Sequence, residues 1–588
     1  MAIGRLSLSW AHKGDALISD GDGGYEWVDP DDPRTREVRL LDPVNSVGET
    51  TGTPGDNLLI RGNGLHAMRA LLSSPEYADE YRGKVKLVYI DPPFNTGQAF
   101  EHYDDGVEHS VWLSMLRQHL EAIRDLLTPD GSVWVHLDDA EGAYAKVVMD
   151  EVFGRQNHVS TVIWEKSDSP RNSARFLSVD QDYIYVFAKD SEKWRPNKIA
   201  RSASVDAKYK NPDDDPNGRW FGDNLRANKP YSLGRYEVTG PTGRTFSPPS
   251  GKYWRISEEK FREYESEGRI WWGAKNDAFP TMKRYLTEVG DMVPRTLWRH
   301  ADVGSNRTSN SEMKALFPDQ ESFSTPKPER LLARVLDVAS NPGDIVLDCF
   351  AGSGTTAAVA QKKERRWVTM ELRNSTVDRY VAPRLRAVVD GRDTGGVSTV
   401  KSLEAESELP EGVTPEDARA FRSVLKRFTD HAGRGAVDAA AVAALRGMAA
   451  VREVSTPLWS GGGGFRELRV APPVFEQREL GSMSFTTIAD GVDDVRLARS
   501  VAAQIGYTSD NEAGPFVGRR GRSRLAVVRG VFDMPLAESL LAALDDGETL
   551  FVAATTIEED ARAHVRTVVK GSRVITIPGG LFMKGGAR

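Results

Sequence analysis

The chain has 588 residues, of which 39% are hydrophobic and 28% charged, and its formal net charge is −8. That length and hydrophobic content can fill several globular domains, which excludes wholesale disorder. Its single cysteine, Cys349, excludes disulfide bridges and cysteine-rich zinc sites, so we expect a cytoplasmic protein. No apolar run approaches the roughly 20 residues of a membrane span and no metal-binding spacing is present, so we expect neither a membrane nor a metal partner.

The first regular elements predict a parallel sheet. Residues 1–56 are rich in Gly, Asp and Pro, and we expect an N-terminal arm with little regular structure. A strand at 58–60 then precedes a helix whose apolar residues, such as Leu65 and Met68, recur at helical spacing. The next strand, at 85–90, contains four consecutive apolar residues, which is typical of a strand buried on both faces. This βαβ unit predicts an α/β fold.

The second strand runs directly into Asp91, Pro92, Pro93 and Phe94, and the two prolines end it. Ligands of open α/β sheets bind beyond the carboxyl ends of the strands, so we expect a site here. A carboxylate and a proline carbonyl can accept both N–H bonds of an exocyclic amino group on a nucleobase, while the aromatic ring stacks on the base. The alternative is that Asp-Pro-Pro only terminates the strand.

Further elements extend the same sheet. Apolar residues between 112 and 127 recur at helical spacing, and residues 132–137 read as a buried strand. Residues 159–164 and 183–187 predict two more strands, which suit a hairpin pair at the sheet edge. Regular alternation of strands and helices is lost after this pair.

A basic, aromatic window follows in an otherwise acidic chain. Residues 194–300 contain 20 Lys and Arg against 14 Asp and Glu, with six of the 13 tryptophans and six of the 16 tyrosines. Basic residues among aromatics are typical of nucleic-acid contacts. We therefore expect DNA contacts from Lys208, Lys210, Lys229 and Arg235. The alternative is a small aromatic core with a solvated surface.

A glycine-rich turn marks the second half of the sheet. A buried strand at 345–348 opens into Phe350-Ala-Gly-Ser-Gly-Thr-Thr before a helix, so backbone N–H groups can approach a ligand. No Gly-Lys-Ser or Gly-Lys-Thr is present, which excludes a Walker loop. The next strand ends in Glu371, a carboxylate placed to accept both hydroxyls of a ribose. A nucleoside without a phosphate group fits best.

These residues resemble a known family. Asp91-Pro-Pro-Phe and Asp348-x-Phe-Ala-Gly-Ser-Gly-Thr-Thr resemble the S-adenosylmethionine-dependent amino-methyltransferases of DNA. The catalytic motif precedes the cofactor motif by 257 residues, as in the permuted β class. Together with Thr325-Pro-Lys-Pro-Glu, these motifs are similar to modification subunits of type III restriction systems. The resemblance implies a Rossmann-like sheet, an inserted target-recognition domain and a base flipped into the pocket.

The resemblance also implies roles for residues. Those implied as catalytic are Asp91, Pro92, Pro93 and Phe94. Those implied for S-adenosylmethionine are Asp348, Phe350, Ala351, Gly352, Ser353, Gly354, Thr355, Glu371, Asn63, Thr325, Lys327 and Pro328. Asn63 departs from the Gly-Asp of many relatives, although its carbonyl can still accept a hydrogen bond from the cofactor's adenine amino group.

The expected domain boundaries follow the motifs. They are an N-terminal arm (1–56), the catalytic half of the methyltransferase (57–190), the target-recognition insertion (191–322), the cofactor half (323–400), a linker with helices (401–460) and a small C-terminal α/β domain (461–588). In the last, strands and helices alternate from 525 onward, beside an arginine cluster at 519–524.

The first function hypothesis is a DNA adenine N6-methyltransferase of a restriction-modification or related phage-defence system. Within the family, Asp as the first residue of the catalytic motif mostly accompanies adenine and Ser accompanies cytosine, so Asp91 favours adenine. The alternatives are a cytosine-N4 methyltransferase and a DNA-recognition subunit with little methyl transfer of its own. Expected partners are double-stranded DNA, a separate restriction (helicase-nuclease) subunit and a second copy in a homodimer.

Overall fold

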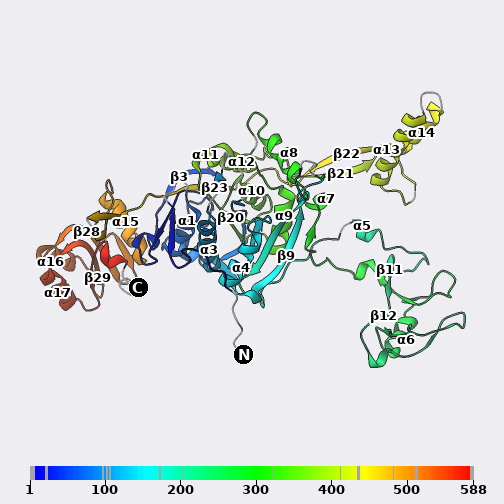
Figure 1. Ribbon diagram of the computed structural model, residues 1–588, viewed down its shortest axis with the longest axis horizontal. Helices are drawn as coiled ribbons and strands as arrows, with labels where there is room; N and C mark the ends of the chain where they lie inside the picture. The colour runs from blue at the N-terminus through cyan, green and yellow to red at the C-terminus, as the bar shows by residue number, and fades with distance from the viewer. Residues whose placement is uncertain are drawn as a thin grey trace. The chain divides into compact units, whose positions relative to one another are not determined.

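The computed structural model divides into two compact units, Met1–Arg195 with Arg295–Arg588, and Pro196–Pro294 (Figure 1). The described residues are 7–19, 24–95, 99–100, 103–104, 108–170, 174–201, 203–321, 323–410, 412–432, 437–480, 483–509 and 514–582. Among them, no helix has both the length and the apolar character needed to cross a membrane.

The first unit is built on a ten-stranded sheet. Its centre consists of β5 (Val85–Ile90), β19 (Ile345–Asp348) and β20 (Arg366–Glu371), all parallel. From one edge to the other, the strand order is β18-β9-β10-β8-β5-β19-β20-β4-β23-β3. The outer strands are β18 (Leu297–Trp298), β9 (His158–Glu165), β10 (Gln181–Ala188), β8 (Leu127–Leu137), β4 (Asn57–Arg61), β23 (Gly464–Val470) and β3 (Leu41–Gly48). This mixed sheet with helices confirms the predicted α/β class.

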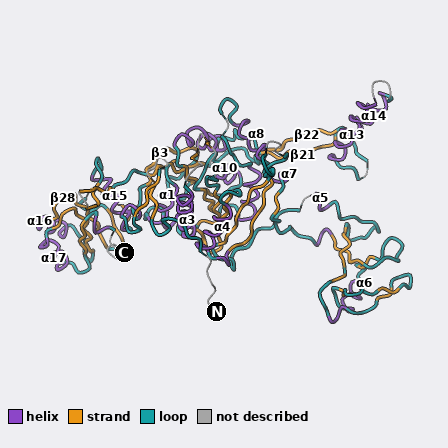
Figure 2. The backbone as a smooth tube through the Cα atoms, viewed as in Figure 1, coloured by secondary structure: helices purple, strands orange, loops and turns teal. Residues whose placement is uncertain are grey.

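Two groups of helices pack against the sheet (Figure 2). Alternate strand residues such as Ile60 and Ile90 share one core with α1 (Gly64–Ser73), α3 (His109–Leu126) and α4 (Gly142–Phe153). In the second group, α9 (Glu329–Ala339) contacts β5, and α10 (Thr355–Lys362) contacts β19 and β20. Helix α12 (Ala382–Val389) packs on α10 and on the edge strand β3. Helices α2 (Ala78–Tyr81) and α11 (Asn374–Thr376) and a π-helical turn (Val377–Val381) complete this part.

The predicted antiparallel pair is confirmed. Strand β10 runs antiparallel to both β8 and β9, and β18 adds a short parallel strand outside β9. The chain then forms α7 (His300–Val303) and α8 (Asn306–Leu316), which belong to the first unit. The inserted unit, 196–294, is therefore shorter than the 191–322 expected.

Two segments outside the expected methyltransferase boundaries belong to its sheet. Strand β23 lies parallel to β4 with Phe465 and Leu468 fully buried, and β3 pairs antiparallel to β23 at the edge. Pro43 in β3 hides the strand from sequence reasoning, but an edge strand tolerates a missing N–H, and the register shifts opposite it. The arm expected to be irregular also forms a hairpin, β1 (Ala16–Ser19) with β2 (Tyr25–Val28).

The inserted unit has an aromatic core. Its sheet has the order β11 (Trp220–Asn224), β17 (Thr281–Tyr285), β16 (Ile270–Trp271), beside α6 (Glu258–Ser266). Trp254, Trp272, Phe246 and Phe261 pack together in the interior. For these residues the aromatic-core alternative is correct. The remaining elements are α5 (Ala203–Asp206), β12 (Arg226–Ala227), β13 (Val238–Thr239), β14 (Thr245–Phe246) and β15 (Tyr253–Trp254).

The last third of the chain contains a β-hairpin whose two strands are connected through two helices, followed by a small domain. Strands β21 (Thr399–Ala405) and β22 (Val451–Pro457) pair antiparallel, with α13 (Pro415–Ala432) and α14 (Ala439–Met448) between them in sequence. The predicted C-terminal alternation is confirmed as β28 (Ser523–Phe532), α16 (Met534–Ala542), β29 (Thr549–Ile557), α17 (Glu559–Val568) and β30 (Arg573–Thr576). Strands β26 (Thr508–Ser509) and β27 (Gly518–Arg520), helix α15 (Asp494–Ile505) and the hairpin β24 (Phe475–Leu480) with β25 (Met483–Ile488) precede it.

Candidate active site

A cavity of about 540 Å³ lies at the carboxyl ends of β5 and β19. It brings together two motifs that are 257 residues apart in the sequence. The predicted site residues that line it are Asp91, Pro92, Pro93, Phe94, Thr325, Lys327, Asp348, Phe350, Ala351, Gly352, Ser353 and Thr355. The reason is strand pairing: Leu347 of β19 aligns with Val88 of β5, so both strands end at the same edge of the sheet.

Asp91 is paired with a lysine. Its Oδ2 accepts a hydrogen bond from Lys327 Nζ at 2.5 Å, and the same ammonium lies 5.0 Å from the centre of the Phe94 ring. The other oxygen, Oδ1, is buried and has no hydrogen-bond partner among the described residues. The resemblance implied Lys327 for the cofactor, whereas the structure places it on the catalytic carboxylate.

The two proline carbonyls are not equivalent. The Pro93 carbonyl accepts a hydrogen bond of 2.8 Å from the indole Nε1 of Trp112, on α3. This bond fixes the turn to the helix and already uses the Pro93 oxygen. Pro92 and Pro93 both line the cavity, and no hydrogen bond to the Pro92 carbonyl is found among the described residues.

A buried polar chain supports Phe94 from within the sheet. His136 lies 6.0 Å from the Phe94 ring centre, its Nδ1 pairs with the Tyr89 hydroxyl at 2.7 Å and its Nε2 lies 3.3 Å from Asp182 Oδ2. Asp182 Oδ1 accepts a hydrogen bond of 2.6 Å from Lys166. Burial lowers the pKa of His136; for Asp182, burial acts upward, but the His136 hydrogen bond and the nearby lysines lower its pKa to about 2.

Sequence reasoning missed this chain of groups. The signal was a histidine and an aspartate inside otherwise apolar strands, at positions 136 and 182. Buried polar groups need partners, so two such residues on neighbouring strands indicate a network.

Two buried carboxylates accept hydrogen bonds from the glycine-rich turn: Asp348, which lines the cavity, and Glu371 at the end of β20. Gly352 and Gly354 adopt positive φ angles of 53° and 74°, which explains the glycines. Asp348 accepts a hydrogen bond from Phe350 N at 2.9 Å, and Glu371 accepts one from Gly352 N at 3.0 Å. Burial raises the pKa of Asp348 and of Glu371 to about 7 each. A cationic ligand would restore the charged forms.

Four of the residues implied for the cofactor do not line the cavity. Glu371 lies behind the turn, and a side chain at Gly354 would meet Val381 Cγ1 at 3.1 Å. Pro328 precedes α9 as its N-cap residue. Asn63 caps α1, because its Oδ1 accepts hydrogen bonds from the backbone N–H groups of residues 65 and 66, at 2.9 and 3.2 Å. The turn thus depends on glycine for its backbone angle and its packing.

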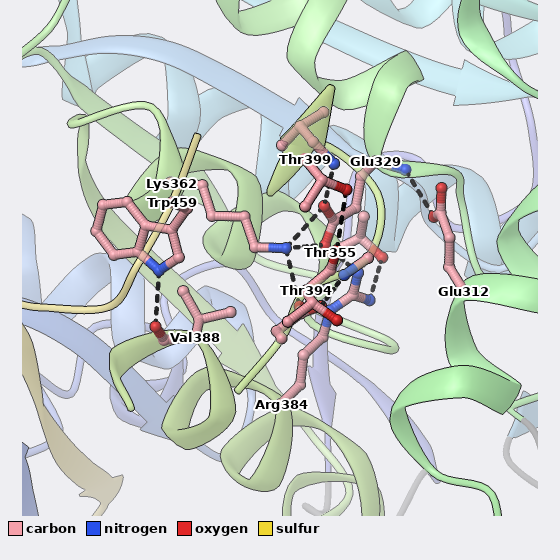
Figure 3. Close-up of polar contacts among 12 residues, drawn as sticks. Glu312, Glu329, Thr355, Lys362, Arg384, Val388, Thr394, Thr399 and Trp459 are labelled. Atoms are coloured by element: carbon pink, nitrogen blue, oxygen red, sulfur yellow. Dashed lines mark hydrogen bonds and ion pairs between the residues drawn. The ribbon is translucent and has the colours of Figure 1, made fainter. Parts of the chain in front are cut away.

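A buried ionic cluster, shown in Figure 3, holds the start of α10. Arg384 donates to Thr355 Oγ1 at 2.8 Å and to Glu329 Oε1 at 2.9 Å. Lys362 bridges Glu329 and Asp393, at 2.7 and 2.9 Å. Thr355 lines the cavity, so the cluster connects the cavity wall to the segment before β21. No motif or spacing in the sequence predicts this cluster.

The four cations expected to contact DNA lie in the inserted unit. Lys208, Lys210, Lys229 and Arg235 are all exposed. Arg235 donates to the Tyr253 hydroxyl at 2.8 Å, and its guanidinium lies 4.9 Å from the centre of that ring. Exposed cations over a solvent-facing tyrosine are compatible with phosphate contacts.

Comparison with known proteins identifies the class that the sheet and the two motifs define. The chain belongs to a family described as DNA methylase, which matches residues 85–382, just over half of its length. The resemblance stated from the motifs is thereby confirmed.

Comparison with individual relatives shows which members of the family the chain resembles. The type III restriction-modification enzyme StyLTI Mod subunit of Salmonella typhimurium is 30% identical over 332 residues, which cover 51% of this chain and 49% of that protein. The Haemophilus influenzae protein described as "Probable type III restriction-modification enzyme HindVI Mod subunit" is 29% identical, covering 63% and 56%. The type II methyltransferase M.EcaI of Enterobacter cloacae is 28% identical, covering 56% and 70%. The chain spans about half the length of the two Mod subunits.

Proposed function

We propose that this chain transfers a methyl group from S-adenosylmethionine to the exocyclic N6 of an adenine flipped out of duplex DNA. The observation that carries the proposal is the buried Oδ1 of Asp91, which has no hydrogen-bond partner in the part of the chain that the structure describes and shares one cavity with the glycine-rich turn. We further propose that it acts in the cytoplasm as a homodimer and as the modification component of a restriction-modification or related phage-defence system, with a separate restriction subunit. The similarity to Mod subunits supports this assignment.

The cavity residues fit S-adenosylmethionine. The ligand carries positive charge, and Asp348 and Glu371 are buried carboxyls whose pKa values of about 7 leave them ready to ionise beside a cation. The positive φ of Gly352 brings its backbone to the cavity wall, and Phe350 supplies an apolar surface. When bound, S-adenosylmethionine supplies an electrophilic methyl group.

The residues around Asp91 prepare the amino group of the base. Asp91 Oδ1 accepts one of its two N–H bonds and the Pro92 carbonyl accepts the other, which draws the nitrogen lone pair out of the ring system. Phe94 stacks on the base, held from behind by His136. Because Lys327 lies over Phe94 and on Asp91 Oδ2, its ammonium must shift from the ring when the base enters.

The test is to map modified bases in host DNA with and without the gene by single-molecule sequencing. N6-methyladenine in one recurring sequence supports the proposal, whereas N4-methylcytosine or an unmodified genome contradicts it. The Asp91→Ala variant should lose on the order of 10² to 10³ in rate or more, because one preorganised acceptor is gone. Its affinity for S-adenosylmethionine should stay within a few-fold of the wild type.

A further inference from the structure

A second cavity, of about 720 Å³, adjoins the first. The two share five wall residues, Lys166, Asn306, Asn310, Phe323 and Ser324. The second cavity lies between helix α8 and the segment that follows β9, and both belong to the first unit. None of the roles assigned above uses this cavity, which we call the α8 groove.

The wall of the groove is polar, and helix α8, which forms it, is anchored at its first residue. Asn306, Asn310 and Lys314 recur every four residues of α8 and line the groove. Ser309 and Met313 of the same helix are buried, and Ser309 lines the first cavity. The Asn306 N–H donates to the Lys166 carbonyl at 2.9 Å, which fastens the helix start to the end of β9. Amide and hydroxyl groups on a rigid wall are the usual donors to DNA phosphates and sugars.

The groove is also positive. Lys166, Arg307 and Lys314 line it, against one carboxylate, Asp168. Arg307 pairs with Asp168 at 3.0 Å, but 71% of its side chain remains exposed, so a phosphate can compete for it. A chain with net charge −8 repels DNA at long range and needs such local cationic surfaces.

An exposed apolar pair lies in the segment between β9 and β10, which also supplies residues 167–170 to the wall of the groove. Phe176 and Leu177, between β9 and β10, are each 85% exposed. Arg175 lies 5.1 Å from the centre of the Phe176 ring. Val179, three residues along the chain from Phe176, lines the cavity that contains Asp91. Bulky apolar side chains next to a base-extrusion site are suited to enter the space that the base leaves.

We propose that the α8 groove holds the DNA strand from which the target base is extruded, and that Phe176 fills the vacated position in the base stack. The proposal rests on the proposed function and names the path of its substrate. The flanking phosphates contact Arg307 and Lys314, and the extruded nucleotide passes between the shared walls into the cavity of Asp91.

The salt dependence of binding to a short labelled duplex tests the groove. Each lost phosphate contact should reduce the slope of log K against log[salt] by about 0.9, so Arg307→Ala with Lys314→Ala should reduce it by about 1.8. Lys426→Ala with Arg427→Ala, which removes equal charge from exposed positions of α13, should change it little. An unchanged slope in the groove variant overturns the proposal.

Single substitutions protect this test from a folding artefact. Lys314→Ala alone, at an exposed position of α8, should reduce the slope by about 0.9. Asp168→Asn removes the carboxylate that competes for Arg307, so it should tighten DNA binding by a few-fold. Weaker binding by Asp168→Asn would mean that Arg307 has a structural role in its ion pair with Asp168 and does not contact a phosphate.

Fluorescence of 2-aminopurine at the target position tests the wedge, since the signal rises when the base leaves the stack. Phe176→Ala should lose most of the rise and about 10-fold in methyl transfer, with a smaller loss on a target that is already mismatched. Phe176→Trp should retain both signals. Equal loss on paired and mismatched targets contradicts the wedge. If the wild type transfers no methyl group, the proposed function is wrong. The salt slope still tests whether the α8 groove binds DNA.

Discussion

At the scale of single residues, the main feature of the site is the ion pair between Lys327 and Asp91. Only 10% of the Lys327 side chain is exposed, and it pairs with the Asp91 side chain, which is 22% exposed. Charge-assisted hydrogen bonds of this kind are short and fix the orientation of a carboxylate. We therefore propose that Lys327 positions Asp91, so its removal should affect the chemical step more than ligand affinity.

Lys327→Met should lower kcat by about 10- to 100-fold while the Kd for S-adenosylmethionine stays within a few-fold. The apolar side chain keeps the packing against Phe94 but cannot donate to Asp91. Single-turnover transfer and calorimetry measure the two quantities. Lys363→Met, which removes a partly buried lysine paired with Asp337, is the control. A 10-fold rise in Kd with unchanged kcat would return Lys327 to the cofactor.

The second prediction at this scale concerns pH. Burial raises the pKa of both Asp348 and Glu371 to about 7, above the usual range, so folding favours their protonated forms. This contribution to stability is complete below the pKa of the unfolded carboxyls, about 4, and is lost as pH rises through 7.

A cationic ligand reverses that preference, because it stabilises the ionised carboxyls. The affinity for S-adenosylmethionine should therefore increase between pH 6 and 8 with release of protons. Calorimetry in buffers of different ionisation enthalpy measures both effects. Asp348→Asn should flatten the dependence; a wild-type affinity that falls over this range would show that the carboxyls do not face the cation.

At the scale of elements, the site depends on how β19 and α10 are held. The turn between them has glycines at positive φ, and its first helical residue, Thr355, is bonded to Arg384 of α12. Arg384 and Lys362 both pair with Glu329, which is almost fully buried. Three helices of one layer, α9, α10 and α12, therefore meet at one carboxylate.

Arg384→Met should lower the free energy of unfolding by about 3–5 kcal/mol, because it leaves buried charge without its partner. It should also weaken S-adenosylmethionine binding, since Thr355 loses its fixed position. Chemical denaturation and calorimetry measure the two losses. Arg392→Met, at an exposed pair with Asp390, should change stability by less than about 0.5 kcal/mol. Equal effects of the two substitutions would exclude a structural role for the cluster.

At the scale of the whole molecule, the two compact units suggest separable tasks. Ile199 and Met292 pair through their backbones, so the chain enters and leaves the inserted unit side by side. A short linker can therefore replace residues 200–291 without stretching the chain. All residues around the two cavities lie in the other unit.

Replacing 200–291 by a glycine-serine linker should leave S-adenosylmethionine affinity within a few-fold and abolish sequence-specific duplex binding. The milder variant neutralises Lys208, Lys210, Lys229 and Arg235 together, and should reduce the salt slope by up to about 3.6. Binding assays at several salt concentrations measure this. If the four-site variant keeps the wild-type slope, DNA recognition lies elsewhere in the chain.

The central strands of the sheet, the two motifs and the chemistry that they suggest could all be predicted from the amino-acid sequence. Apolar runs at 85–90 and 345–348, ended by proline or glycine, are local signals, and local signals are sufficient to place Asp91 and Gly352 at strand ends. The family resemblance added the order of the motifs and the cofactor. The resemblance also drew attention to Lys327, but not to its ion pair with Asp91.

Which side chains contact one another in the site could be seen only in the folded structure. Lys327 and Asp91 are 236 residues apart, and Trp112 reaches Pro93 from another helix. The same holds for the pairing of β3 with β23, whose partner residues are 416 to 429 residues apart. β3 contains a proline, and β23 follows a run of glycines. Such contacts depend on how separate elements pack, and no periodicity or spacing within one segment carries that information.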